Sequence, residues 1–159
     1  MKKLLVLASM MLIGAGTAFA QKGQHAIGGN IAYGSEIESL GIGVKYQYNI
    51  TDQLRLEPST TYFFGSDNWS MLDVNCNLHY LFPIAPSVTL YPLGGLTFTN
   101  WSVDWDGGSL NKDKFGVNLG GGAEFALNRD WALNMELKYQ ILGDSFDQAV
   151  FNVGVVYKF

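Results

Sequence analysis

The chain has 159 residues, of which 48% are hydrophobic, 14% aromatic and 15% charged, and 19 are glycines. This composition fits one folded domain and excludes a disordered chain, which would have fewer aromatic residues and more charge. The formal net charge of −4 disfavours a nucleic-acid-binding protein, which needs a basic surface. Cys76 is the only cysteine, so an intrachain disulfide is excluded.

Residues 1–20 have the pattern of a cleavable secretory signal peptide. The basic pair Lys2-Lys3 precedes an apolar run at 4–13, and a small-residue motif follows at 18–20. We expect cleavage before Gln21, which lowers the net charge to −6 because two lysines are lost. The apolar run is too short to span a membrane, and no later segment reaches 18 apolar residues. The segment therefore predicts export without a transmembrane helix.

Residues 21–159 read as eight β-strands in which apolar residues recur at every second position. In chain order the predicted strands are 24–34, 40–49, 54–64, 71–82, 88–98, 114–127, 131–141 and 149–159. The connections at 49–53, 83–87 and 128–130 are short and predict tight hairpins, whereas 99–113 is the longest and predicts a loop. Pro58 and Pro92 lie inside predicted strands, where we expect bulges or kinks because proline cannot donate to the ladder.

The last predicted strand has the clearest alternation. One face carries Phe151, Val153, Val155, Tyr157 and Phe159, and the other carries Asn152, Gly154, Val156 and Lys158. An apolar aromatic strand with an open edge promotes aggregation. We therefore expect this strand to pair on both sides, as it does in a closed sheet.

Charged residues occur on only one face of the predicted strands. The apolar face carries none, and the opposite face carries Lys45, Arg55, Glu57, Asp73, Glu124, Glu136, Lys138 and Lys158. Two architectures produce this pattern. A soluble lipocalin-type barrel turns its apolar face inward, and a membrane barrel turns it outward to lipid.

Three features favour the membrane barrel. Aromatic residues of the apolar face gather near the two ends of the strands, as in the interfacial belts of membrane proteins. The polar face is rich in small residues and balances four positive with four negative charges, which suits a narrow interior. The third feature is an exported chain that ends on an aromatic residue. We predict an all-β protein, an eight-stranded antiparallel up-and-down transmembrane β-barrel.

The signal-peptide pattern, the eight amphipathic strands, the short turns at one end and the terminal VVYKF resemble the small OmpA/OmpX-type outer-membrane barrels. More loosely, they resemble the porin-family outer-membrane β-barrel domain of Gram-negative bacteria. The resemblance implies a monomer in the cell outer membrane, in contact with its lipid and lipopolysaccharide. It also implies that Tyr157 and Phe159 match the C-terminal signal that the outer-membrane assembly machinery reads during biogenesis.

The inward charges are the main candidate site. We expect the eight charged residues named above, together with His79, to form a charge network in the lumen. The network either lines a narrow ion path or closes the barrel as a plug of salt bridges. The narrow interior of eight strands and the zero net charge favour the plug.

Acidic residues gather at the end with the longer connections, which we expect to be extracellular. They are Glu36, Glu38, Asp67, Asp104, Asp106, Asp113, Asp144 and Asp147, accompanied by Lys112 and Lys114. This acidic rim could bridge through divalent cations to lipopolysaccharide phosphates or recognise a basic partner. A merely solvated rim is the third alternative.

We predict no catalytic, cofactor-binding or metal site. His25 and His79 are the only histidines, both map to the periplasmic end, and no nucleophile–base pair is evident. The hypothesis is a non-catalytic outer-membrane barrel with a structural or adhesion-type surface role through its extracellular loops. The alternatives are a small porin-like channel for ions or small solutes and a soluble periplasmic binding barrel.

Overall fold

The computed structural model describes residues 22–65, 68–143 and 145–159, so the predicted signal peptide lies outside the described residues. The described elements are all strands. They are β1 (His25–Gly34), β2 (Ser39–Asn49), β3 (Leu54–Phe64), β4 (Trp69–Tyr80), β5 (Phe82–Ala85), β6 (Val88–Trp105), β7 (Gly108–Ala126), β8 (Trp131–Ile141) and β9 (Gln148–Lys158). Within these residues, no helix is long and apolar enough to cross a membrane.

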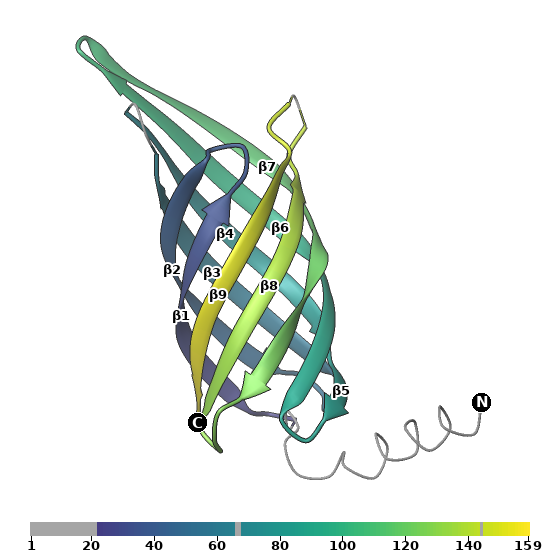
Figure 1. Cartoon of the computed structure of the whole chain (residues 1–159). Helices are drawn as coiled ribbons and strands as arrows, with labels where there is room; N and C mark the ends of the chain where they lie inside the picture. Colours follow the sequence, from purple (N-terminus) through teal and green to yellow (C-terminus); the bar gives the residue numbers. More distant parts are fainter. Residues whose placement is uncertain (1–21, 66–67, 144) are drawn as a thin grey trace.

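The strands form one closed antiparallel barrel (Figure 1). Their order is β4-β3-β2-β1-β9-β8-β7-β6-β5, and pairing of β4 with β6 closes the ring. β4 and β5 both pair with β6, at Leu93–Val103 and Val88–Leu90 respectively, so they are two parts of one interrupted strand. The barrel therefore has eight strands, as predicted.

The period of two separates the two faces of the barrel wall. In β1, Ile27 and Ile31 are 54% and 60% exposed, while the neighbouring Ala26 and Asn30 are buried. The same alternation continues through β9, where Phe151 points outward. The apolar set therefore covers the outside and the polar set fills the interior, which is the inverse of a soluble barrel.

Pro58 does not produce the expected bulge. The register between β2 and β3 is the same on both sides of it, with Lys45 opposite Ser59 and Tyr48 opposite Leu56. The proline interrupts the ladder because it has no N–H to donate, and the neighbouring pairs keep the strands aligned.

Pro92 lies where the ladder between β6 and its neighbour is interrupted, between the last pair of β4 and the first pair of β5. It still pairs with Gly121 of β7. The register shift falls instead between Pro83 and Ala85, near the turn that joins β5 to β6. Of the expected bulge or kink at Pro92, the bulge is absent: the ladder is interrupted there without a change of register, and the register shift lies at the end of the hairpin.

The expected loop at 99–113 was also wrong, because β6 and β7 continue through it as a ladder and reverse at residues 106–107. Ser102 Oγ donates a hydrogen bond across the two strands to Asn111 Oδ1 at 2.9 Å. Figure 1 shows this hairpin projecting well beyond the other connections. An Asp-Gly pair between strands favours a two-residue hairpin turn, and Asp106-Gly107 is such a pair.

Candidate functional site in the barrel interior

The inward residues of β4 run along the barrel and mark its successive interior layers. From the end near β5 towards the opposite end they are His79, Asn77, Asn75, Asp73 and Met71, and all are buried. Strand alternation places them on one line because every second side chain of β4 points inward. Each layer has its own polar or apolar partners from other strands.

Glu124 of β7 binds two cations across the lumen. Its carboxylate lies 2.7 Å from Arg55 Nη1 of β3 and 3.1 Å from Lys158 Nζ of β9. Asn134 Nδ2 of β8 donates to the same carboxylate at 2.9 Å. Buried charges need such partners, because each ion has lost its hydration shell. Glu124 thus joins four strands of the wall through one carboxylate.

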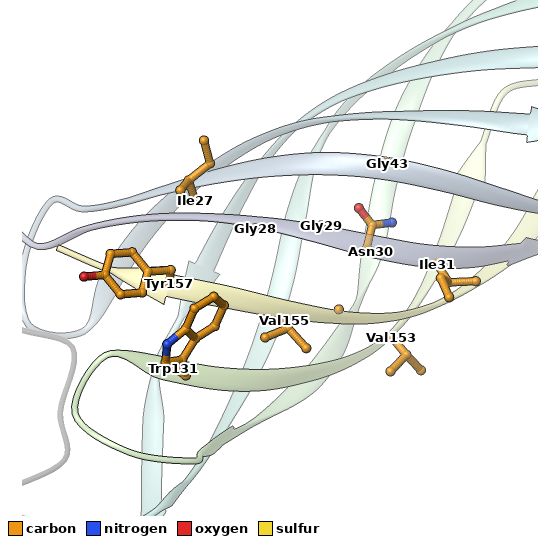
Figure 2. A pocket seen from close by; sticks show the side chains of 11 residues that line it. Ile27, Gly28, Gly29, Asn30, Ile31, Gly43, Trp131, Val153, Val155 and Tyr157 are labelled. Atoms are coloured by element: carbon orange, nitrogen blue, oxygen red, sulfur yellow. The ribbon is translucent and has the colours of Figure 1, made fainter.

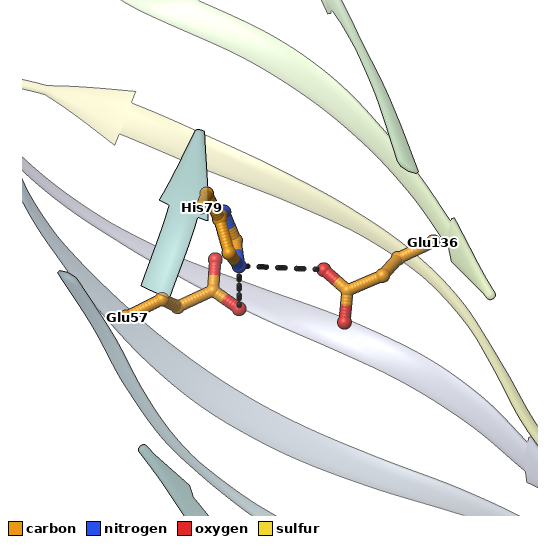
Figure 3. Close-up of side chains that lie close together, drawn as sticks. All are labelled: Glu57, His79 and Glu136. Carbon is orange, nitrogen blue, oxygen red and sulfur yellow. Dashed lines mark ion pairs between the residues drawn. The ribbon is translucent and has the colours of Figure 1, made fainter. Parts of the chain in front are cut away.

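The next layer contains two glutamates and a histidine (Figure 3). His79 Nε2 lies 3.9 Å from Glu57 Oε1 and 3.9 Å from Glu136 Oε2. Lys45 Nζ lies 3.6 Å from Glu57 Oε1, and the Tyr91 hydroxyl donates to Glu136 Oε2 at 3.2 Å. The layer therefore has one more carboxylate than lysine.

Asp73 occupies a third polar layer nearer to the projecting hairpin. Lys138 Nζ lies 3.8 Å from its carboxylate. Thr97 Oγ1 and Gln140 Nε2 donate to it at 2.8 and 3.0 Å. Between this layer and that of His79, Asn118 donates to the amide oxygens of Asn75 and Asn77 at 2.7 and 2.8 Å.

All nine residues predicted to face the lumen are buried in the interior. They are Lys45, Arg55, Glu57, Asp73, His79, Glu124, Glu136, Lys138 and Lys158. The structure joins them in three local groups rather than in one ring of a single sign. Each group contains both signs, which favours mutual neutralisation over the selection of one ion.

The lumen also contains an apolar cluster that we did not predict from the sequence. It lies beyond the polar layers, at the end with the projecting hairpin. It consists of Ala32, Ile37, Phe63, Met71, Trp101 and Val150, with Phe146 packed against it. The period of two in their strands already places Phe63 and Met71 on the inward face, so the burial of these two side chains could have been predicted from the sequence. The inward position of Trp101 was not predicted, because its segment was expected to be a loop.

The acidic rim residues that the structure describes lie at the end with the projecting hairpin. Glu36 and Glu38 are in the turn between β1 and β2, and Asp104 and Asp106 are at the hairpin tip. Asp67 and Asp144 lie outside the described residues.

The other two rim carboxylates have local partners. Asp113 accepts a hydrogen bond from Asn100 Nδ2 of β6. Asp147 Oδ1 accepts the backbone N–H groups of Leu142 and Gly143, both at 2.8 Å. Asp147 therefore shapes its own loop, whereas the carboxylates at the hairpin tip and in the turn between β1 and β2 are exposed.

Tyr157 and Phe159 lie on the outer face at the opposite end. Tyr157 packs against Trp131 of β8, with ring centroids 5.1 Å apart. The backbone N–H of Phe159 donates to the carbonyl of His25 at 2.9 Å, which extends the seam between β9 and β1. Recognition of these two residues by the assembly machinery stays a prediction.

The sequence matches the family model of the outer membrane protein beta-barrel domain over residues 5–159. The chain belongs to this family. It is an integral β-barrel of the Gram-negative outer membrane. No curated protein sequence matches it.

Solved outer-membrane barrels have the same fold. The N-terminal β-barrel domain of Pseudomonas aeruginosa OprF is 16% identical with a TM-score of 0.76, covering 88% of this chain and 100% of that one. Neisserial surface protein A is 17% identical with a TM-score of 0.71, covering 86% of this chain and 96% of that one. Ail, the attachment invasion locus protein of Yersinia pestis, is 18% identical with a TM-score of 0.66, covering 87% and 100%. At these identities the likeness establishes the shared fold.

A groove of about 640 Å³ on the outer wall of this outer-membrane barrel lies over the seam (Figure 2). Its apolar walls come from Ile27, Ile31, Val153, Val155, Tyr157 and Trp131. Gly29 forms part of its floor, because this outward position of β1 has no side chain. The wall faces lipid in an outer-membrane barrel, so hydrocarbon chains are the matching occupants.

Proposed function

We propose that this outer-membrane barrel is non-catalytic and acts at the cell surface through the hairpin of β6 and β7. Membrane barrels have short periplasmic turns and longer extracellular connections, so this hairpin is extracellular. The observation that carries the proposal is the open edge of β7. The ladder between β7 and β8 begins only at Val117. As far as the structure describes the chain, residues 108–113 of β7 therefore pair with β6 alone.

An open strand edge offers unpaired backbone groups to a strand of another protein. The outer part of the hairpin presents apolar anchors beside this edge, since Trp105 is 54% exposed and Leu110 is 59% exposed. Exposed tryptophan side chains contribute disproportionately to protein interfaces. Asp104 and Asp106 flank Trp105. The combination fits an extended partner segment that is basic and apolar.

The acidic tip also argues against one class of ligand. Yersinia pestis Ail has been crystallised with the heparin analogue sucrose octasulfate, a polyanion. A tip with carboxylates on both sides of Trp105 repels polyanions, because like charges brought together without a counterion are unfavourable. We therefore propose a basic partner for this chain rather than a sulfated glycan.

Replacing Trp105 with alanine should weaken binding of the barrel to an immobilised basic, strand-forming peptide by roughly 30-fold or more, the loss typical of an interface anchor. The measurement uses the barrel in lipid nanodiscs, with an acidic peptide of the same pattern as a second surface. Trp69→Ala is the matched control, because Trp69 is also exposed at this end but lies at the start of β4. Equal binding to both peptides, or equal losses in both variants, contradicts the proposal.

The same assay with immobilised lipopolysaccharide as the surface tests the lipopolysaccharide alternative for the rim. Bridging through divalent cations requires those cations, so EDTA abolishes it. Direct recognition of a basic peptide by Asp104 and Asp106 survives EDTA and weakens in Asp104→Asn and Asp106→Asn. Contact of the barrel with lipopolysaccharide itself stays a proposal.

A channel is the alternative role, and the filled interior argues against it. Phe63, Met71 and Trp101 pack together in the lumen, and three layers of buried charged residues fill the interior next to them. In planar bilayers we expect the purified barrel to produce no discrete conductance steps, because a packed interior leaves no continuous water path. Reproducible steps of one size would support the channel instead.

A further inference from the structure

Three ligand-forming atoms converge in the second polar layer. The side chains of Glu57, His79 and Glu136 each place one such atom within 4.8 Å of the others, and all three residues are buried. They come from β3, β4 and β8, so the closed barrel assembles the cluster from distant parts of the chain. Figure 3 shows both carboxylates directed at the same ring nitrogen.

His79 points to a ligand independently of the acidic residues. It is 0% exposed, and neither of its ring nitrogens has a hydrogen-bond partner among the described residues. Leaving a buried imidazole unsatisfied is unfavourable, and most buried polar groups have a partner. The ring stacks on Tyr91, with centroids 4.4 Å apart and planes at 11°. This packing holds the imidazole in place while its nitrogens lack partners.

We propose that Glu57, His79 and Glu136 bind a divalent transition-metal ion inside the barrel, with Zn²⁺ as the best match. Zinc takes imidazole nitrogen and carboxylate oxygen at about 2.0–2.2 Å, so its ligand atoms lie roughly 3.3–3.6 Å apart. His79 Nε2 is 3.9 Å from each carboxylate oxygen. These gaps exceed hydrogen-bonding distance, and a contraction of a few tenths of an ångström brings them to the spacing of a metal site.

The charges of the layer match a cation. Glu57 and Glu136 contribute two negative charges, and Lys45 is the lysine that pairs with one of them, at 3.6 Å. The remaining carboxylate, Glu136, has the Tyr91 hydroxyl as its hydrogen-bond donor. Glu57, Glu136 and Lys45 leave the layer with a net charge of −1, so a cation at this position compensates the carboxylate of Glu136, and a dication brings the layer to +1.

Neighbouring side chains already orient the two carboxylates. Gln47 Nε2 donates to Glu57 Oε2 at 2.6 Å, which leaves Oε1 turned towards His79. The Tyr91 hydroxyl donates to Glu136 Oε2, the same oxygen that faces His79, and so holds this oxygen in position. Such outer partners orient the ligands of established metal sites. The cluster thus has ligands, oriented carboxylates and a fixed imidazole, in a place where we had predicted no metal from the sequence.

The test loads the metal during folding, because the site is enclosed. Untagged barrel is folded from urea into detergent micelles with Zn²⁺ or with EDTA, and zinc bound per folded barrel is measured after gel filtration. We expect about one zinc per barrel. Co²⁺ in place of Zn²⁺ should give visible absorption bands of a cation held by nitrogen and oxygen.

The decisive variant is His79→Phe, which keeps a ring on Tyr91 and removes both unpartnered nitrogens. It should fold in EDTA as well as the original chain, and it should lose the bound zinc and the cobalt bands. His25→Ala is the matched control, since His25 is the only other histidine and lies at the periplasmic end. Equal zinc contents in the His79→Phe variant and the original chain overturn the proposal, as does loss of zinc in His25→Ala.

Two further variants separate a metal site from a plain ion-pair network. Glu136→Gln should weaken zinc binding at least about 10- to 100-fold, the loss that follows even when only a side chain that orients a ligand is removed. Lys45→Met removes a cation that competes with zinc for Glu57, so it should tighten zinc binding by about tenfold or more. Where this variant fails to fold in EDTA, zinc should restore its folding. If Lys45→Met misfolds equally with and without zinc, the layer is an ion-pair network and the proposal fails.

Discussion

Replacing Glu124 with glutamine should lower the free energy of unfolding of the barrel by about 3–5 kcal/mol, the range for breaking a buried ion pair. Within the described residues, Glu124 is the carboxylate that lies within 4 Å of Arg55 and of Lys158. Glutamine keeps the size of the side chain but removes its charge. Two cations in the interior then lose their counterion, which is why we expect this substitution to have a larger effect than loss of either cation alone.

Urea unfolding in lipid vesicles measures this effect, with the folded fraction scored by the compact migration of the unboiled barrel in detergent gels. Glu36→Gln is the control, because it removes the same charge from an exposed turn and should change stability by no more than about 0.5 kcal/mol. Adding Arg55→Met to Glu124→Gln should restore part of the loss, since one unpaired cation is then removed. Equal stabilities of the two glutamine variants would show that the network contributes nothing.

Replacing Gly28 with valine should prevent closure of the barrel or destabilise it by at least about 3 kcal/mol, the upper range for overpacking. Gly28 faces inward from β1 at the seam with β9. A Cβ atom there would lie 2.2 Å from the backbone oxygen of Val155 and 2.9 Å from Cα of Val156. These are backbone atoms of the closing strand, so the contact is relieved only by moving the strands apart.

The next residue provides a matched control. A Cβ atom at Gly29 would have its nearest neighbour at 3.6 Å, the backbone oxygen of Gly43, and would point into the groove on the outer wall. Gly29→Val should therefore fold and remain within about 0.5 kcal/mol of the original chain, or gain from better strand propensity. Folding yields in lipid vesicles compare the two variants directly. If Gly28→Val folds as readily as Gly29→Val, the close approach of β1 and β9 does not require a glycine at position 28.

The placement of the charged residues was predictable because strand alternation is a local property. Lys45, Glu57 and Glu136 each occupy an inward position that depends only on the period of two along their own strands. Their partners were not predictable, because contacts across the lumen depend on the stagger and tilt of strands far apart in sequence. The convergence of Glu57 and Glu136 on His79 is one such contact.

The errors have the same origin. The segment around Trp101 was predicted to be a loop because of the turn signals at Asp104–Gly108, yet pairing with β4 and β7 holds it as a strand. A bulge or kink was expected at Pro58, but the neighbouring pairs on both sides keep the register of β2 and β3. In each case hydrogen bonds from neighbouring strands override the local preference.

The sequence by itself determined that this protein is an exported outer-membrane barrel of eight strands. Lipid permits only structures whose backbone is fully paired, and it imposes an apolar residue at every second position, so the pattern is readable without coordinates. Only the tertiary structure decided which charges meet in the lumen, that apolar side chains close it above them, and that β7 has an open edge beyond the barrel. These features depend on the register of strands around a closed ring, which local alternation does not encode.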